Sequence, residues 1–251
     1  MSTQAPESQW IRAVALLGLL IIWHVVAAWL NDPILPEPLA VLETLYRGVV
    51  EGELLEHLGI TLLRVAAAFM LAFGIGSVIG ILMGRSALTN SLLDIMLIIG
   101  LNIPALVTII LCYIWFGLNE AAAITAVAIN KIPTTVVMLR EGARAVDQQL
   151  MQVARVYRLP PWQTLTKVYL PQLYPYFMAA ARNGLALIWK IVLVVELLGR
   201  SDGIGFQLGV FFQFFDIQTI LAYTLAFVVV ILLVESCLLR PFDKVIARGR
   251  A

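Results

Sequence analysis

The sequence predicts an all-α, polytopic membrane protein in which six transmembrane helices form a single bundle. Of its 251 residues, 61% are hydrophobic and only 13% are charged, and the mean hydropathy is +0.92. A soluble domain carries about 25% charged residues. The apolar residues fall in blocks of about 20, the length that a helix needs to cross the hydrocarbon core of a bilayer. These observations place most of the chain inside a membrane.

Six apolar blocks predict the spans in order. They are Ile11–Leu30, Thr61–Met83, Leu92–Phe116, Ala121–Leu139, Tyr174–Leu198 and Ile217–Leu239. The polar, proline-containing segment Asn31–Gly59 is expected to lie outside the membrane. Pro104 falls within the third span, and Pro133 is expected to break the fourth. Small residues let helices pack closely, and the second span has four glycines at Gly74, Gly76, Gly80 and Gly84.

Charge placement predicts the orientation of these spans. One side of the six-span arrangement receives most basic residues, namely Arg12, Arg85, Arg140, Arg144, Arg155, Arg158, Lys167, Arg240, Lys244, Arg248 and Arg250. The other side receives Glu37, Glu43, Glu51, Glu53, Glu56, Glu120, Asp202 and Asp216. Cytoplasmic loops are enriched in lysine and arginine. Both termini are therefore expected in the cytoplasm.

The motifs of catalysis and of metal or nucleotide binding are absent from the sequence. No Gly-Lys pair occurs, so the chain has no phosphate-binding loop of the usual kind. The two histidines, His24 and His57, are far apart, and no histidine motif for zinc is present. The segment Gly199–Gly205 contains Ser201 but is predicted to be a structural turn. We expect no catalytic residue, no metal, no cofactor and no nucleic-acid partner.

The polar stretch Gln152–Pro171 separates two spans and predicts a docking surface. Pro160-Pro161 cannot continue a helix, so the chain must bend there. Apolar residues recur at helical spacing on both sides of the bend, at Val153, Ala154 and Tyr157 before it and at Trp162, Leu165 and Tyr169 after it. Leu170-Pro171 is expected to close the second short helix. An alternative is that both helices lie on the lipid surface.

This stretch resembles the cytoplasmic EAA loop of ABC-importer permeases. When Val168–Pro171 is aligned with the end of the family motif, Gln152-Val153-Ala154 takes the place of Glu-Ala-Ala and Arg158 takes the place of the glycine. The segment from Trp162 to Pro175 resembles the branch of the family that serves nitrate, sulfonates and taurine. A left-handed turn at Arg158 would cost about 1–2 kcal/mol, so the turn is expected to be rebuilt around Pro160-Pro161.

The resemblance implies a type I ABC importer permease fold, as one transmembrane domain over residues 1–251 with a coupling loop at about 140–171. It implies a bacterial inner-membrane permease that imports a small anionic or zwitterionic solute by alternating access. Its implied partners are two ABC ATPase subunits that hydrolyse ATP, a second permease chain (a homodimer is favoured), an extracytoplasmic solute-binding protein and membrane lipid. The implied ATPase-coupling residues are Gln152, Val153, Ala154, Arg155, Tyr157, Arg158, Leu159 and Trp162.

Ionisable residues within the predicted spans give candidates for the transport path. They are Arg64, Asp94, Lys131, Arg182, Lys190, Glu196 and Glu235, and each costs about 2.5–3.5 kcal/mol at the middle of a membrane unless protein or water surrounds it. Arg64, Asp94 and Arg182 lie near span ends, where snorkelling or interhelical pairing explains them. The segment IWKIVLVVELLG resembles the family's fifth span, which lines the path.

From these features the predicted path residues are Lys131, Trp189, Lys190 and Glu196, together with Asn102, whose segment before Pro104 resembles the family's third span. A structural role for each stays open at this point. Two other functions also stay open: a secondary transporter that works without ATP, and a membrane subunit that transports nothing. The absence of inverted repeats and the presence of the docking stretch argue against the first, and the charges within the spans argue against the second.

Overall fold

The computed structural model describes residues 7–234 and residue 236, and every regular element in that part of the chain is a helix. The elements are α1 (Glu7–Leu30), α2 (Pro38–Val50), α3 (Leu54–Arg85), α4 (Ala87–Asn102), α5 (Ala105–Phe116), α6 (Glu120–Arg144), α7 (Gln148–Val156), α8 (Pro161–Gln163), the π-helix η1 (Thr164–Tyr169), α9 (Leu170–Gly199), α10 (Ile204–Gln213) and α11 (Ile217–Val234). The predicted all-α class is confirmed. Glu235, the end of the predicted sixth span and the C-terminal basic residues lie outside the described residues.

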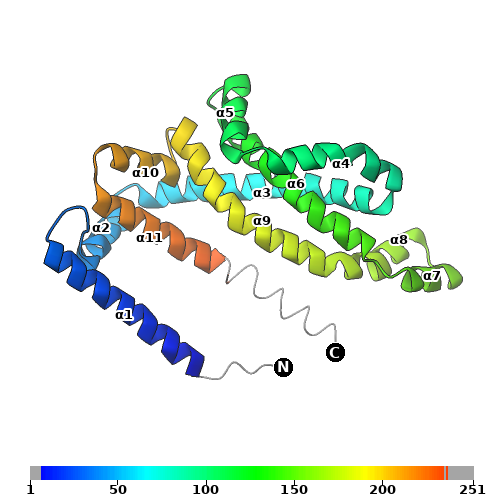
Figure 1. The fold of residues 1–251 in the computed structure, drawn as a ribbon, viewed down its shortest axis with the longest axis horizontal. Coiled ribbons are helices and arrows are strands. Elements are labelled where there is room, and N and C mark those ends of the chain that lie inside the picture. The colour runs from blue at the N-terminus through cyan, green and yellow to red at the C-terminus, as the bar shows by residue number, and fades with distance from the viewer. Residues whose placement is uncertain (1–6, 235, 237–251) are drawn as a thin grey trace.

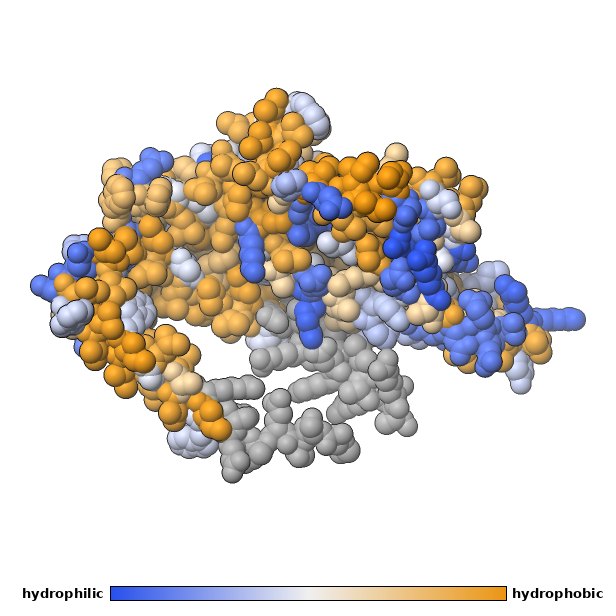
Figure 2. Space-filling model, in the orientation of Figure 1, coloured by the Kyte–Doolittle hydropathy of each residue, from blue (hydrophilic) through white to orange (hydrophobic). Residues whose placement is uncertain are grey.

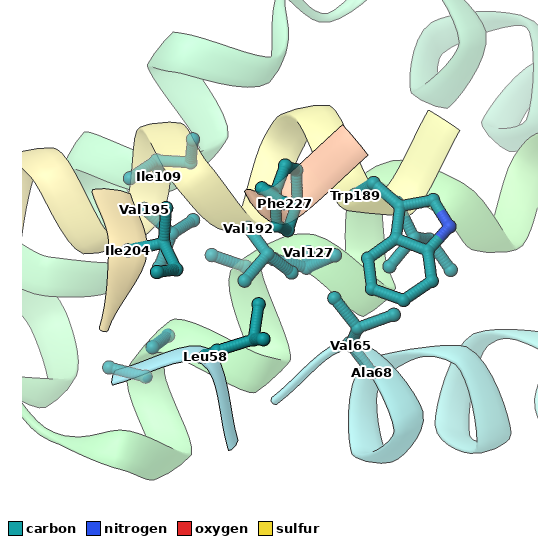
Figure 3. Close-up of a cluster of buried hydrophobic side chains, with 14 of the residues drawn as sticks. Leu58, Val65, Ala68, Ile109, Val127, Trp189, Val192, Val195, Ile204 and Phe227 are labelled. Carbon is teal, nitrogen blue, oxygen red and sulfur yellow. The ribbon is translucent and has the colours of Figure 1, made fainter. Parts of the chain in front are cut away.

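The centre of the molecule is formed by α3, α6 and α9, which pack against one another along their lengths (Figure 1). Their apolar side chains meet those of α5, α10 and α11 in the main core, as Figure 3 shows for Val65 of α3, Val127 of α6 and Val192 of α9. By contrast, α1 diverges from this body, and only 6% of its apolar segment Ala13–Leu30 is buried. The buried centre is thus built from the second to sixth predicted spans.

The glycines of α3 bring its backbone against α6. A Cβ atom added at Gly80 would lie 2.7 Å from the carbonyl oxygen of Val136, and one added at Gly76 would lie 2.7 Å from Cβ of Thr135. A Cβ atom added at Gly84 would likewise lie 2.7 Å from the carbonyl oxygen of Arg140. The predicted close packing is confirmed at these three positions. Gly74 faces open space instead.

The spans differ from their predicted form at two prolines. The third span is two helices, α4 and α5, which meet at Pro104 with a bend of 99°, so it is a broken span or a re-entrant segment and not one straight helix. The expected break at Pro133 is wrong, because α6 runs without interruption from Glu120 to Arg144. Around Pro133, α6 packs closely against two helices. Gly76 of α3 lies near the carbonyl of Ile132, and Gly100 of α4 lies near the Pro133 ring.

Two further segments are more helical than predicted. The segment Asn31–Gly59 contains the amphipathic helix α2 as well as the start of α3. The second short helix after Pro160 does not close at Leu170-Pro171, because η1 continues directly into α9. Within η1 the Leu170 N–H bonds the carbonyl of Leu165, five residues back. A proline has no N–H and its ring crowds the preceding turn, and the wider π-helical turn just before Pro171 relieves that crowding.

Candidate functional site

The docking stretch forms one end of the molecule, where α7 and α8 project beyond the bundle (Figure 1). Asp147 begins α7 as its N-cap, because its carboxylate accepts hydrogen bonds from the N–H groups of Gln149 (2.7 Å) and Leu150 (3.4 Å). The helix ends in a Schellman motif, in which Leu159 N–H bonds Ala154 C=O and Arg158 N–H bonds Arg155 C=O, both at 3.0 Å.

Arg158 occupies the left-handed position of this motif, with φ = +50°. The expectation that the turn is rebuilt around Pro160-Pro161 is therefore wrong. The backbone keeps the turn that glycine adopts most easily, and Arg158 adopts it at a cost of about 1–2 kcal/mol. The last carbonyl groups of a helix have no hydrogen-bond donor within the helix. The Schellman motif supplies donors to two of them, and this gain offsets the strain at Arg158.

The outer surface of this end, which we call the coupling surface, combines large apolar side chains with basic ones. Val156, Tyr157 and Trp162 are 79%, 76% and 72% exposed, and Val153 is 50% exposed. Gln152, Arg155 and Arg158 are also exposed around them, whereas Leu159 is half-buried. Figure 2 shows that this end is hydrophilic in contrast to the apolar flanks of the long helices. An apolar patch with a polar border usually marks an interface.

Part of the predicted docking stripe faces inward. Ala154 is only 2% exposed, and Tyr169 packs with Ala143, Val146 and Leu173 in a small core of its own. The guanidinium of Arg85 lies 5.2 Å from the Tyr169 ring centre, in a cation–π contact. Beside α7 a groove of about 390 Å³ is lined by Leu150, Val153, Ala154, Tyr157, Leu159, Lys167, Val168, Pro171 and Gln172. One face of the stretch therefore packs against the bundle, and the opposite face is exposed to solvent.

A buried polar network, which we call the Arg64 network, lies at the other end of the bundle. The guanidinium of Arg64, 4% exposed, donates to Glu196 (2.9 Å), to Glu120 (2.9 and 2.5 Å) and to the Asp202 carboxylate and carbonyl. It therefore joins α3 to the start of α6, to α9 and to the loop before α10. Arg200 also bonds Glu120, at 2.6 Å. The predicted interhelical pairing of Arg64 is borne out.

Glu196 is the most enclosed member of this network, with no exposed surface. It also accepts hydrogen bonds from the Thr61 hydroxyl (2.9 Å) and the Gly205 N–H (2.8 Å). Gly203 has φ = +96°, and a Cβ atom there would lie 2.5 Å from Glu196 Oε1. The glycine-rich turn is therefore structural, because it lets the backbone approach a buried carboxylate. Sequence reasoning found Glu196 as a charge but missed its partners.

The structure separates the other predicted path residues. Trp189 is buried edge-to-face against Phe227, with ring centres 5.8 Å apart. Beside it the exposed Lys190 lines a hollow of about 310 Å³ together with Arg182. Lys131 is buried on α6, and Asn102 is exposed at the end of α4, where its amide donates to the Ile98 carbonyl at 2.7 Å. Trp189 and Lys190 line the same hollow.

A polytopic helix bundle with ionisable residues buried within its spans is typical of a membrane transport protein. Residues 76–240 match the family model described as "Binding-protein-dependent transport system inner membrane component". The chain belongs to this family and is a multi-pass inner-membrane permease of the ABC transporter type, as the sequence predicted. The rival functions, a secondary transporter or a non-transporting subunit, are not favoured.

Its relatives include permeases named for three solutes. It is 32% identical to the putative aliphatic sulfonates transport permease protein SsuC of Bacillus subtilis, over 90% of this chain and 83% of the relative. It is 28% identical to the taurine transport system permease protein TauC of Escherichia coli (86% and 82% covered). It is 30% identical to the nitrate import permease protein NrtB of Synechocystis sp. (77% and 74% covered).

Solved structures show the same fold. An inward-facing structure of the MetNI methionine ABC transporter matches with a TM-score of 0.62 at 18% identity, over 75% of this chain and 92% of that one. A crystal structure of an amino acid ABC transporter with histidines matches with a TM-score of 0.56 at 21% identity, over 78% and 92%. The predicted permease fold is therefore confirmed.

Proposed function

We propose that this chain, paired with a second copy of itself, forms the transport path of an ATP-driven importer for a small anionic or zwitterionic solute. Two ABC ATPase subunits bind the coupling surfaces, and an extracytoplasmic solute-binding protein delivers the solute at the opposite end. ATP hydrolysis takes place on the ATPase subunits. Both termini and the coupling surface lie in the cytoplasm, as the charge asymmetry of the loops favours.

One observation carries this proposal: a compact, exposed surface lies outside the membrane-spanning helices yet is continuous with one of them. Through η1, the α8 part of the coupling surface, which carries Trp162, is joined to α9 with no intervening loop. Motion of a partner bound at Trp162 is therefore transmitted directly to a spanning helix, and motion at Tyr157 reaches it through the turn at Arg158. Two arrangements of the bundle, biased by nucleotide on the partner, then give inward-open and outward-open states.

The solute class is supported by charge and by the relatives. Lys131 and Lys190 place positive charge on α6 and α9, and a cation within a span that faces water or protein favours an anionic solute. The relatives named for sulfonates, taurine and nitrate carry such solutes by name. A sulfonate, a nitrate ion or the acidic group of a zwitterion fits this requirement.

A charge substitution on the coupling surface tests the partner assignment. In cells that co-express the cognate ABC ATPase, Tyr157→Asp is expected to reduce the co-purified ATPase by about tenfold or more, since a central aromatic anchor contributes 2 kcal/mol or more to an interface. Tyr157 is preferable to Ala154, because a charge at the buried Ala154 would also disturb this chain's own packing.

Tyr46→Asp serves as the matched control, since Tyr46 is 66% exposed on α2 and far from α7. It should leave ATPase binding unchanged. Wild-type levels of ATPase with the Tyr157 variant would show that α7 lies on the lipid surface instead, and the proposed coupling would be lost.

A further inference from the structure

The N-terminus of α10 is capped by side chains of two other helices. Its own N-cap is a glycine, which offers no side chain. The first N–H groups of a helix have no acceptor within that helix. Here three of them, those of Gly203, Ile204 and Gly205, donate to His57 Nδ1 (3.0 Å), to the Thr61 hydroxyl (2.8 Å) and to the Glu196 carboxylate (2.8 Å). His57 and Thr61 are four residues apart and share one face of α3, so that face holds the start of α10.

The hydrogen bonds of His57 fix its protonation state. The residue is only 7% exposed. A backbone N–H can only donate, so Nδ1 accepts from Gly203 through its lone pair, and the proton of the neutral ring lies on Nε2. The Gln207 side-chain amide lies 2.5 Å from Nε2, and the Glu53 carboxylate lies 3.5 Å from it. With its amide oxygen toward the ring, Gln207 accepts the Nε2 proton. The cap therefore requires the neutral imidazole.

A second proton on the ring would break this cap. It adds at Nδ1, and both ring nitrogens of a charged histidine are donors. Nδ1–H would then face the N–H of Gly203, donor against donor. The new positive charge would also lie at the N-terminus of α10, where the helix dipole disfavours cations. Histidine changes charge between about pH 5 and 8. The bond to Gly203 is present while the ring is neutral and is lost as the pH falls through that range.

The charged groups around the ring favour Glu53 as its counter-ion. Three acids deeper in the bundle are already held by Arg64, namely Glu120, Glu196 and Asp202. On α2, Glu43 and Arg47 pair with each other at 2.5 Å. α10 and α11 carry no charged residue, and Tyr223 of α11 is a neutral phenol. Among the described residues, Glu53 is therefore the acid left to stabilise a charged ring.

We propose that His57 is a proton-sensitive latch, which holds α10 against α3 when it is neutral and releases the start of α10 when it takes a second proton. α10 connects α9 to α11 and packs on both, so its release loosens this end of the bundle. The direction of the signal rests on the proposed function, which places this end outside the cytoplasm. The latch then responds to the pH of the medium.

Hydrogen exchange on the whole chain in nanodiscs of zwitterionic lipid tests the latch. Protection factors, which compare each amide with an unstructured peptide at the same pH, are measured at about pH 8 and about pH 5. In the wild type, protection over residues 203–205 should fall by about tenfold or more at the lower pH, because a buried N–H loses its acceptor. His57→Asn places an amide oxygen near the position of Nδ1 and does not titrate, so its protection should not fall.

The other histidine supplies the matched control. The sequence has two histidines, and His24 lies half-exposed, 3.7 Å from Glu37. His24→Asn should therefore show the same fall in protection as the wild type. Each protein is compared with itself at two pH values, so a constant loss of stability in a variant cancels.

Ring-nitrogen NMR tests the protonation state itself. In His24→Asn labelled with ¹⁵N-histidine, the only ring signals are those of His57. At about pH 8, Nδ1 should be unprotonated and Nε2 protonated, and at about pH 5 both should carry protons. A protonated Nδ1 at the higher pH, a ring still neutral at the lower pH, unchanged protection in the wild type, or an equal fall in His57→Asn would each overturn the latch. Those results would leave the ATPase co-purification, and with it the proposed function, intact.

Discussion

The Arg64 network makes a quantitative prediction about stability. Replacing Arg64 by methionine keeps the length of the side chain but removes every donor that Arg64 gives to Glu120, Glu196 and Asp202. Glu120 and Asp202 are partly exposed and can turn to water. Glu196 is fully buried and keeps only the bonds from Thr61 and Gly205. Breaking a buried pair in this way costs about 3–5 kcal/mol.

The double variant Arg64→Met/Glu196→Gln isolates the cause. The neutral amide of glutamine still accepts bonds from Thr61 and Gly205, so the remaining loss is that of one or two hydrogen bonds, about 1–2 kcal/mol. The double variant is therefore expected to be more stable than Arg64→Met by about 2 kcal/mol. Unfolding of the purified chain in mixed micelles, titrated with denaturant, measures both free energies. If Arg64→Met costs less than about 1 kcal/mol, or the double variant is no better, the network does not stabilise the bundle as described.

Three further predictions concern the turn, the packing and the topology. Arg158→Gly should raise the free energy of unfolding by about 0.5–1 kcal/mol, because the strain of the left-handed backbone exceeds the entropy that glycine adds to the unfolded chain. A loss of stability in the same denaturant titration would contradict the φ of +50° at Arg158. Gly80→Leu should lower the free energy of unfolding by about 3 kcal/mol, because the new side chain overpacks against the Val136 carbonyl. Gly74→Leu, whose side chain meets open space, should lower it little. Similar losses of stability in the two variants would exclude close packing of α3 on α6. With an impermeant thiol reagent on intact cells, Glu53→Cys should react and Arg155→Cys should not, and labelling of the latter would reverse the topology.

The spans and the docking stretch could be predicted because their causes are local. Transfer of an apolar block into lipid depends on that block alone, and Pro160-Pro161 forbids a continuous helix wherever it occurs. Whether the helix breaks at Pro104 or at Pro133 could not be predicted in the same way. Pro104 separates two helices, whereas Pro133 lies inside α6 where α6 packs against α3 and α4.

The Arg64 network escaped prediction because its members are remote in sequence. Arg64 is 56 residues from Glu120, 132 from Glu196 and 138 from Asp202. A charged side chain within a span indicates that another polar group must pair with it. Which group that is depends on which helices pack beside it. The glycines at Gly203 and Gly205 were a usable signal, since a close backbone approach to a buried group is one reason for glycine.

The two ends of α9 explain how one helix can serve a transport cycle. At the end of α9 that carries Glu196, the Arg64 network ties it to α3, α6 and α10. At the end joined to η1, α9 packs on Gly142 of α6 through Tyr176 and on Phe73 of α3 through Phe177, and it continues into the exposed coupling surface. On the proposed function, a partner's motion enters the bundle at the η1 end of α9, and the ion pairs of the Arg64 network hold the opposite end. The proposed function with rocking of the bundle about the Arg64 network predicts that hydrogen exchange on ATPase binding changes around η1 and stays constant at Gly205.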